Sequence, residues 1–573
     1  MSLQMEYFLG TSDDGVKIIN IKENNINICL GKKDKEQENI KEFVYNLNIP
    51  DGESLIFIFG LGSGEYIKEL INNIGYGNKV YIFEPEEIIY NNIMADTYIN
   101  SMLKEDSRIN IFYFKNKNQI MNILNRYVDK SYLNKYVCSH YTNYEKVFLN
   151  KFNMFSEAIK EFWIEVGALR ASNIMFSNIV IENYINNIKE IEKNTNANEL
   201  KNSFLGSTAI IVSSGPSLEK NIKFLKEYKD NCIIICASRS IQELIKNEMA
   251  PDFICAIDPG EIMEKLFKQS MDLEIPMVVT EQVNFNIVKN YKGKKIFVLN
   301  SFKNIIEKMC NEEYISIPVG GSVAHLATAF AVFLGAKNVI FIGQDLAFTN
   351  NKYHSTLSTN ENLIKEKANF NKNDLFYVEG NVEEKVLTNN SFITFKNWFE
   401  VFISNNRDVN FINSTEGGAK IRGTKIMPLQ DSLSIYCKER INKNVVNLDT
   451  TKNIEGVIIK YLNRQLQCMN ELTLKGIEYS NKMINYYEGN KNVKINNVLK
   501  KLDDIDLKLY KTEEIIYMLN LFKYKEMEML NNKDEYREKI DESEREAGIR
   551  LGKRSLQCYK IYNNGIKEIM SKF

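Results

Sequence analysis

Residues 208–225 read Thr-Ala-Ile-Ile-Val-Ser-Ser-Gly-Pro-Ser-Leu-Glu-Lys-Asn-Ile-Lys-Phe-Leu and have the pattern of a buried strand, a tight turn and a helix start. The apolar run at residues 209–212 is rich in β-branched side chains, which is typical of a parallel strand covered on both faces. Pro216 fits the first turn of a helix, and Leu218 begins an apolar helical face. Because the N–H groups at a helix start bind phosphate well, the segment predicts a nucleotide-binding turn, with a purely structural turn as the alternative.

The same pattern recurs through a central region that we place at residues 196–435. Buried strands are predicted at residues 209–212, 232–237, 253–257, 276–280, 296–299 and 339–342. Polar residues follow several of these strands, and a Gly320-Gly321-Ser322 turn opens a long helical pattern. Open α/β sheets bind ligands beyond the carboxyl ends of their strands, so we expect a site there. Ser238 and Asp258 are suited to bond a ribose or base, with turn capping as the alternative for Asp258 and Asp345.

A second glycine-rich turn lies in the N-terminal region. A predicted strand at residues 55–59 precedes Gly60-Leu61-Gly62-Ser63-Gly64, and a strand at residues 80–83 ends at Glu84. Glycines after a strand with an acid about twenty residues later are the pattern of a dinucleotide or adenosyl-methionine fold. The alternative is that the turn serves close packing only, and we expect no methyl or hydride transfer from this region.

Composition narrows the class of protein. The chain has 573 residues and a net charge of -1, with 26% charged residues. That length predicts several domains, and the balanced charge argues against nucleic acid or anionic lipid as the main partner. No apolar run is long enough to cross a bilayer and no signal peptide pattern is present, so we expect a cytoplasmic protein. Nine scattered cysteines and three histidines predict free thiols and no histidine-built metal site.

Several motifs together resemble those of the motility-associated factor (Maf) flagellin glycosyltransferases. They are residues 60–62, 213–218 (Ser-Ser-Gly-Pro-Ser-Leu), 256–259 (Ala-Ile-Asp-Pro), 320–325 (Gly-Gly-Ser-Val-Ala-His), 343–347 (Gly-Gln-Asp-Leu-Ala), 390–400 and 414–419 (Ser-Thr-Glu-Gly-Gly-Ala). The resemblance follows the family's order over nearly the whole chain. It implies an α/β protein with a Rossmann-like N-terminal domain (1–195), a central domain similar to bacterial sialyltransferases (196–435) and a C-terminal helical domain (436–573).

The resemblance also implies an activity. The chain would transfer a nonulosonic acid of the pseudaminic or legionaminic type from its CMP-activated form to Ser or Thr of flagellin. The residues expected to hold the donor are Ser213, Ser214, Gly215, Pro216, Ser217, Ser238, Asp258, Gly320, Gly321, Ser322, Thr415 and Gly417. The expected catalytic rim consists of Gln344, Asp345, His354 and Glu416. The acceptor hydroxyl needs a base, for which Asp345, His354 and Glu416 are the candidates. Sialyltransferases of this type use a histidine, which supports His354, with an ordinary surface-loop histidine as the alternative. Substitution of Asp345 is expected to cause the larger loss of activity. His325 is interpreted as a core or supporting residue.

Two other classes of function fit parts of the sequence. The central domain is also similar to an archaeal pterin pyrophosphokinase, in which Asp258 and Asp345 would hold Mg²⁺ on a triphosphate. A flagellin-binding scaffold without activity is the third hypothesis. The sequence predicts no resident cofactor, and it leaves a need for Mg²⁺ and the oligomeric state open.

Overall fold

The computed structural model describes residues 6–23, 26–50, 53–75, 77–129, 136–300, 303–310, 316–348, 375–443, 456–539 and 542–573. The chain forms two compact units, and α7 (Leu149–Ile191) and several C-terminal helices contribute residues to both. The first comprises Met1–Ala171, Gly476–Leu502 and Glu526–Tyr559, and the second comprises Ser172–Lys475, Asp503–Lys525 and Lys560–Phe573. The mixed α/β class predicted from the sequence is confirmed, whereas the three domain ranges stay a prediction.

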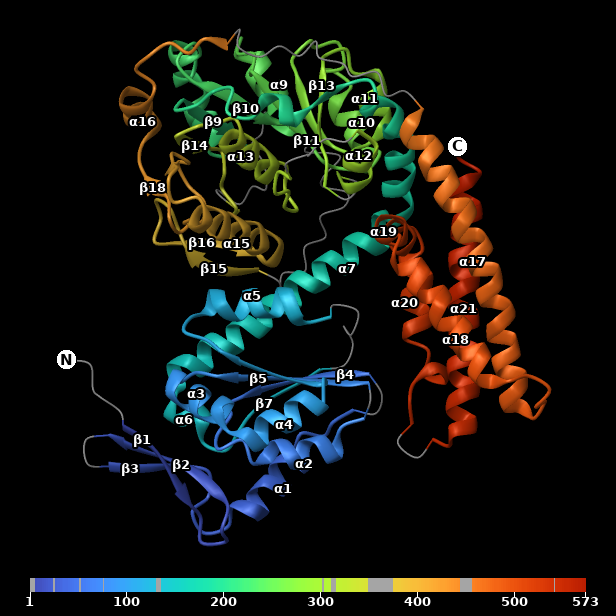
Figure 1. Ribbon diagram of the computed structural model, residues 1–573. Coiled ribbons are helices and arrows are strands. Elements are labelled where there is room, and N and C mark those ends of the chain that lie inside the picture. Colours follow the sequence, from blue (N-terminus) through green and yellow to red (C-terminus); the bar gives the residue numbers. More distant parts are fainter. Residues whose placement is uncertain are drawn as a thin grey trace. The chain divides into compact units, whose positions relative to one another are not determined.

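The first unit contains a parallel sheet and a small antiparallel one (Figure 1). The antiparallel strands are β1 (Glu6–Thr11), β2 (Lys17–Glu23) and β3 (Ile26–Leu30). The parallel sheet, in the order β6-β5-β4-β7, consists of β4 (Ser54–Phe59), β5 (Asn78–Glu84), β6 (Ile109–Tyr113) and β7 (Tyr136–His140). Its helices are α1 (Glu36–Asn46), α2 (Tyr66–Asn73), α3 (Glu87–Ala95), α4 (Thr97–Glu105), α5 (Lys117–Tyr127) and α6 (Tyr144–Val147).

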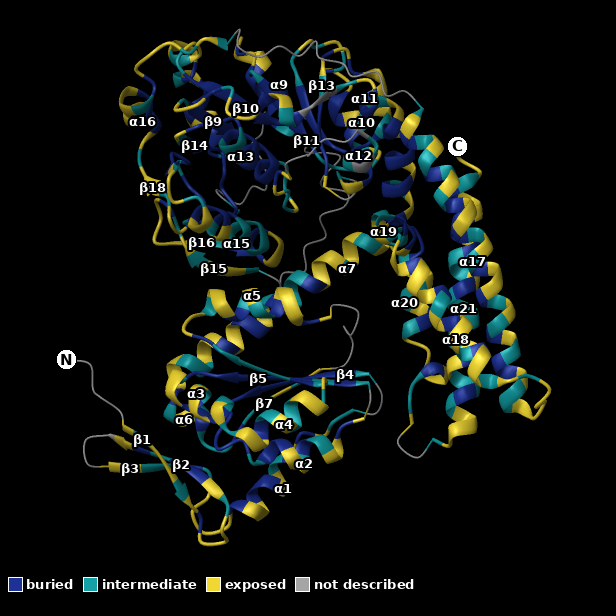
Figure 2. Ribbon diagram, viewed as in Figure 1, coloured by how far each residue is buried: buried dark blue, intermediate teal, exposed yellow. Residues whose placement is uncertain are grey.

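The second unit is built on a parallel sheet in the order β18-β17-β14-β9-β10-β11-β12-β13-β8. These strands are β8 (Thr195–Asn196), β9 (Thr208–Val212), β10 (Ile233–Ala237), β11 (Phe253–Ala256), β12 (Met277–Thr280), β13 (Lys295–Val298), β14 (Asn338–Ile342), β17 (Asn410–Asn413) and β18 (Lys425–Ile426). Each of the six strands predicted for the central region begins and ends within one residue of the observed strand. Every residue of β9 and β10 is buried, as expected of parallel strands covered on both faces (Figure 2).

Helices and a hairpin complete the second unit. The helices are α8 (Leu218–Asn221), α9 (Ile241–Lys246), α10 (Ile262–Phe267), α11 (Phe285–Asn290), α12 (Lys303–Cys310), α13 (Val323–Phe333), α15 (Asn390–Asn405) and α16 (Leu429–Tyr436). The hairpin consists of β15 (Leu375–Glu379) and β16 (Lys385–Asn389). Apolar α13 packs across β9, β10 and β11. The region after α16 is helical where it is described, as predicted: α17 (Val457–Glu488), α18 (Ile495–Tyr510), α19 (Glu513–Phe522), α20 (Tyr524–Asn531) and α21 (Glu544–Met570).

The helix predicted to start at Pro216 is much shorter than expected. Only α8 is α-helical, and 3-10 turns follow at Ile222–Phe224 and Lys226–Tyr228. The side chain of Asn221 is buried and donates to the carbonyl of Ser414 at 2.8 Å. The local sequence pattern favours a longer α-helix, but this tertiary contact with a distant segment stabilises the shorter one that is observed. A single helical turn has little macrodipole, so the predicted dipole at this position is wrong.

In the first unit, tyrosine side chains fill the space beside the glycine turn that follows β4. A Cβ atom on Gly60 would lie 2.4 Å from the ring of Tyr144, and one on Gly62 would lie 2.7 Å from the ring of Tyr141. The Gly62 N–H donates to the Tyr144 hydroxyl at 2.9 Å. The hydroxyl of Tyr66 donates to the Gly60 carbonyl, also at 2.9 Å. These glycines therefore admit aromatic rings of the same unit, which favours the packing interpretation of the turn.

Glu84 binds the same turn. It is fully buried, and its Oε2 atom accepts hydrogen bonds from the Leu61 N–H at 2.8 Å and the Tyr144 hydroxyl at 3.0 Å. Its Oε1 atom accepts from the N–H of Glu86 at 3.0 Å. Burial raises the pKa of Glu84 to about 8, although these three hydrogen bonds act in the opposite direction. The carboxyl group that would bind a ribose in a dinucleotide site is thus used inside the protein.

We predict that Glu84 makes the first unit less stable as the pH rises from about 5 to 8. Because the pKa of Glu84 is about 8 in the folded chain and 4.5 ordinarily, the folded state retains a proton that the unfolded state releases within this window. The free energy of unfolding should fall by up to about 1.4 kcal/mol per pH unit for one such group. Glu84→Gln should remove that part of the slope.

The measurement is thermal unfolding followed by Trp163 fluorescence in a Trp398→Phe background, since the chain has only these two tryptophans. Glu42→Gln, which removes an exposed carboxylate on α1, is the matched control and should leave the slope unchanged. An identical pH dependence in Glu84→Gln and its parent would contradict the prediction.

Candidate functional site

The strand order of the second unit creates a crevice between β9 and β14. From β9 the chain adds β10, β11, β12 and β13 in one direction, and it then returns to place β14 on the other side of β9. Because the connections leaving β9 and β14 diverge, a gap opens beyond their carboxyl ends. The predicted polar residues follow these strands, so the topology brings them to one edge of the sheet.

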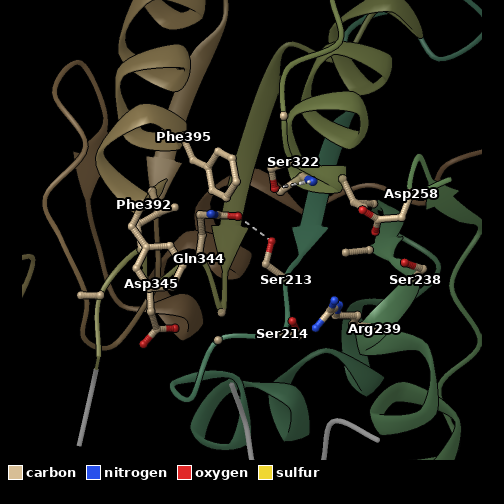
Figure 3. Close-up of a pocket in the computed structure, with 18 residues that line it drawn as sticks. Ser213, Ser214, Ser238, Arg239, Asp258, Ser322, Gln344, Asp345, Phe392 and Phe395 are labelled. Carbon is tan, nitrogen blue, oxygen red and sulfur yellow. Dashed lines mark hydrogen bonds between the residues drawn. The ribbon is translucent and has the colours of Figure 1, made fainter. Parts of the chain in front are cut away.

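A cavity of about 260 Å³ lies at this edge (Figure 3). Its lining residues are Ser213, Ser214, Gly215, Ala237, Ser238, Arg239, Asp258, Gly321, Ser322, Val323, Ala324, Gly343, Gln344, Asp345, Leu346, Ala347, Phe392 and Phe395. Nine of them are residues that we predicted from the sequence as site residues. The predicted residues Pro216, Ser217, Gly320, Thr415, Glu416 and Gly417 are not in this lining, and His354 lies outside the described residues.

The turn after β9 is bonded to the turn after β14. The Ser213 N–H donates to the Ile342 carbonyl at 3.0 Å, and the Gly215 N–H donates to the Gly343 carbonyl at 2.8 Å. A Cβ atom on Gly215 would lie 2.0 Å from Oδ2 of Asp345. Gly215 is therefore required for the contact between two protein segments. The prediction that the N–H groups of this turn are free for a ligand is wrong for Ser213 and Gly215, because both already donate within the protein.

Asp345 holds the turn that contains Gly215. Its side chain is buried, and its Oδ2 atom accepts from the Ser217 hydroxyl at 2.7 Å and from the Ser217 N–H at 3.4 Å. In Figure 3 its carboxylate is directed away from Ser213 and Arg239. Ser217, predicted as a donor-binding residue, is likewise buried and bonded to Asp345.

Gln344 is oriented by two neighbours. Its Oε1 atom accepts from the Ser213 hydroxyl at 2.6 Å, and its backbone N–H donates to Oγ1 of Thr415 at 3.2 Å. Because Ser213 uses the amide oxygen, the amide NH₂ is the end of the side chain directed away from Ser213 (Figure 3).

The turn at Thr415, Glu416 and Gly417 supports the cavity from outside its lining. Besides its bond to Gln344, Thr415 accepts through its carbonyl from Asn381 at 2.6 Å. The Ala419 N–H donates to the Asp345 carbonyl at 2.7 Å, and a Cβ atom on Gly418 would lie 2.2 Å from the same oxygen. The carbonyl of half-buried Glu416 accepts from Lys220 at 3.3 Å. The motif thus positions Gln344 and Asp345.

Backbone strain is present where the turn after β14 faces the cavity. Leu346 has a φ of 50° and Gly343 a φ of 63°. A left-handed conformation costs a leucine roughly 1–2 kcal/mol, which the surrounding contacts must offset. The Leu346 carbonyl accepts from the Thr388 hydroxyl at 2.9 Å, and the Phe348 N–H donates to the Leu387 carbonyl at 2.8 Å. The β15–β16 hairpin therefore holds the strained turn.

The N-terminus of α13 forms the opposite wall. Its cap is Ser322, whose hydroxyl accepts from the Ala324 N–H at 3.3 Å, while the Ser322 N–H donates to Nδ1 of His325 at 3.3 Å. This is a capping box in which histidine takes the usual place of glutamate or glutamine. The prediction that the Gly320-Gly321-Ser322 turn opens a long helix is confirmed.

His325 connects this turn to α15. The imidazole is 1% exposed, and burial lowers its pKa to about 3. Because Nδ1 accepts a hydrogen bond, the ring proton is on Nε2, which donates to the Phe395 carbonyl at 3.1 Å. The ring stacks on Trp398 with centroids 4.1 Å apart. His325 is thus a neutral supporting residue, as the sequence suggested, and it joins two walls of the cavity.

Nine of the 18 lining residues were not predicted as site residues, and among these Arg239, Phe392 and Phe395 carry a charged or aromatic side chain. Arg239 follows Ser238 at the end of β10, and its position just past a strand is the signal that could have identified it. Phe392 and Phe395 come from α15, where an apolar helical pattern does not distinguish core residues from cavity residues. Burial raises the pKa of Asp258, whereas the nearby Arg239 guanidinium lowers it.

Two features are absent from the described part of the chain, a metal-binding cluster and a membrane-spanning helix. No group of three or more His, Cys, Asp or Glu side chains there is arranged to hold a metal ion. Likewise, none of the described helices has the length and hydropathy needed to span a membrane.

Comparisons with known proteins relate the chain to two groups. Residues 182–351 match a family described as 6-hydroxymethylpterin diphosphokinase MptE-like, and this range contains both strands that flank the crevice. The fold is similar to a solved structure described as the MAf glycosyltransferase from Magnetospirillum magneticum AMB-1. That match has a TM-score of 0.56 and 14% sequence identity, and it covers 99% of this chain and 90% of the other. The resemblance to Maf proteins is thereby confirmed at the level of the fold. No curated protein sequence matches the chain significantly.

We predict that His325 is needed for the shape of the cavity. His325→Leu should lower the stability of the second unit by about 1–3 kcal/mol, because it removes the part-buried hydrogen bonds that the ring makes with the Ser322 N–H and the Phe395 carbonyl. His325→Gln supplies one acceptor and one donor and restores the usual capping box, so it should recover much of the loss.

The measurement is chemical unfolding followed by Trp398 fluorescence in a Trp163→Phe background. His140→Leu, which removes a partly exposed histidine of the first unit, is the matched control. The role assigned to His325 fails if the glutamine variant is as unstable as the leucine variant.

Proposed function

We propose that this chain is a glycosyltransferase and that its nucleotide-activated donor binds in the cavity between β9 and β14. The observation that carries the proposal is the cavity itself, which lies at the topological switch point of a parallel sheet and is lined by polar residues from four strand ends. The fold shared with the MAf glycosyltransferase over almost the full chain supports the same class of enzyme.

The finer proposal concerns the donor and the acceptor. The motif resemblance supports a CMP-activated nonulosonic acid as the donor and Ser or Thr of flagellin as the acceptor. The donor-binding part would consist of the cavity residues of the turns after β9, β10, β11 and β14, together with the Gly321-Ser322 turn. Pro216, Ser217, Gly320, Thr415 and Gly417 would act by supporting these turns, because they lie outside the lining.

The reaction breaks the bond between the anomeric carbon and the phosphate oxygen of CMP. The bonding electrons leave with CMP, the acceptor oxygen forms the new bond to the anomeric carbon, and its proton passes to a base. Negative charge develops on the phosphate, so fixed hydrogen-bond donors near it stabilise the transition state. The hydroxyl of Ser322, at the N-terminus of α13, would take this role, since the helix dipole favours negative charge there and the Ser322 N–H already donates to His325.

Asp345, His354 and Glu416 remain the candidates for the base, with Gln344 orienting the sugar or the acceptor. Asp345 lines the cavity but also bonds Ser217, so its substitution tests two roles at once. Asp345→Asn keeps an oxygen that can accept from Ser217 and removes the basic group. If Asp345 is the base, the transfer rate should fall by about 10²- to 10⁴-fold.

Ser217→Ala separates the two roles of Asp345. It removes the hydroxyl donor to Asp345 but leaves the carboxylate in place. A purely structural role of Asp345 therefore predicts a loss of activity in Ser217→Ala and little loss in Asp345→Asn, whereas a role as the base predicts the larger loss in Asp345→Asn. Rates are measured with saturating donor and unmodified flagellin, after melting temperatures have been compared. If Asp345→Asn stays within a few-fold of its parent, Glu416→Gln and His354→Ala are the next variants to assay.

A pyrophosphokinase is the second candidate, and the match of residues 182–351 to the MptE-like family favours it. Such an enzyme would bind a nucleoside triphosphate with Mg²⁺ beside Asp258 and Asp345. Thermal protection distinguishes the two, since CMP should stabilise the transferase and ATP with Mg²⁺ should stabilise the kinase.

The acceptor is tested by the intact mass of flagellin. We predict that flagellin from cells lacking this protein is lighter by whole nonulosonic acid residues than flagellin from parent cells. Complementation with the parent gene should restore the mass, whereas the Asp345→Asn variant should not. An unchanged flagellin mass in the deletion strain would refute flagellin as the acceptor.

A further inference from the structure

The two sides of the cavity differ in chemical character. Ser238, Arg239 and Asp258, from the ends of β10 and β11, lie on one side, and Gln344, Phe392 and Phe395 lie on the other (Figure 3). Arg239 is the one basic residue in the lining, all of which is described. The first side therefore offers a cation, a carboxylate and a hydroxyl, whereas the second offers an amide and two aromatic rings.

Ser238 presents a polar atom that needs a partner. Its side chain is 3% exposed, and its Oγ atom has no hydrogen-bond partner among the described residues. A buried hydroxyl without a hydrogen bond is unfavourable, so such groups normally have a partner. Because Ser238 lines the cavity, a bound ligand is the natural source of its partner.

The backbone that carries Arg239 is rigidly placed. Ser238–Ser240 form a 3-10 turn directly after β10, and the buried Ser240 hydroxyl donates to the Val212 carbonyl at 3.2 Å. This bond ties the turn after β10 to the end of β9. The guanidinium group lies close enough to Asp258 to lower the pKa of that carboxyl. A planar guanidinium that is held at a cavity wall is well suited to a phosphate group.

We infer that Ser238, Arg239 and Asp258 form the subsite for the phosphoribosyl part of the donor, with Arg239 binding the phosphate and the other two bonding ribose hydroxyls. The inference rests on the proposed function and adds the orientation of the donor. The ribose faces Asp258, and the sugar to be transferred faces Gln344, Phe392 and Phe395. The N–H groups of Ser213 and Gly215 already donate within the protein, so they are not available to the phosphate. Arg239 supplies the positive charge that binds the phosphate in their place.

The test compares a nucleotide with its nucleoside. The parent and Arg239→Met are titrated with CMP and with cytidine by calorimetry, after melting temperatures have shown that both are folded. Removing a hydrogen-bonded phosphate contact should weaken CMP binding by about 10- to 100-fold and leave cytidine affinity unchanged. Arg239→Lys keeps the positive charge but not the paired N–H donors of the guanidinium group. Its affinity for CMP should lie between those of the parent and Arg239→Met. Lys226→Met removes an exposed cation that pairs with Glu248 and should not change either affinity.

Each outcome bears on the inference. Equal weakening of CMP and cytidine in Arg239→Met would mean that the arginine only shapes the cavity, and unchanged CMP affinity would mean that it does not bind the phosphate; either overturns the assignment. The parent is also titrated with UMP, AMP and ATP and the matching nucleosides. If the parent binds one of these nucleotides instead of CMP, the proposal of a CMP-activated donor is refuted. The affinities of Arg239→Met for that nucleotide and its nucleoside then still test whether Arg239 binds the phosphate. If the parent binds none, both the donor and the subsite are refuted.

Discussion

The hydrogen bond from the Gly215 N–H to the Gly343 carbonyl is the contact on which the site of the second unit depends. It joins the turns that leave two neighbouring strands, β9 and β14, although 128 residues separate Gly215 from Gly343. The approach is possible because Gly215 has no Cβ atom to meet Asp345, and because Gly343 adopts a left-handed φ. With the turns bonded to each other, the diverging connections beyond them enclose a cavity of defined shape.

The opposite wall of the cavity, at the N-terminus of α13, is held in place by His325. His325 bonds the backbone of Ser322 on one side and of Phe395 on the other, and its ring is packed against Trp398. A neutral imidazole with one donor and one acceptor suits this position, and burial keeps it neutral at physiological pH. Both walls of the cavity are therefore positioned by hydrogen bonds that join segments distant in the chain, which is the arrangement that a preorganised binding site requires.

The two glycine turns of the chain show how neighbours determine the use of one motif. Both follow a buried parallel strand near a switch point of strand order. Beside Gly60 and Gly62 the space is occupied by Tyr144 and Tyr141, and Glu84 is bonded to the turn. Gly215, by contrast, allows two protein segments to approach each other closely, and an open cavity remains next to it. A glycine turn after a strand therefore marks a place of close packing, and only the side chains that arrive from elsewhere decide whether a ligand can enter.

The sequence by itself determined the strands of the central sheet and the polar residues at their ends, because a buried parallel strand is a local apolar run that stops where the chain leaves the core. It also identified Ser238, Asp258 and Gln344 as residues of one sheet edge. Tertiary structure alone decided that Asp345 and Thr415 brace turns, that α8 is a single turn, and that Arg239, Phe392 and Phe395 face the cavity. The physical reason is that the direction of a side chain and the partner of an N–H group are set by segments that are distant in the chain, and such contacts leave no local pattern in the sequence.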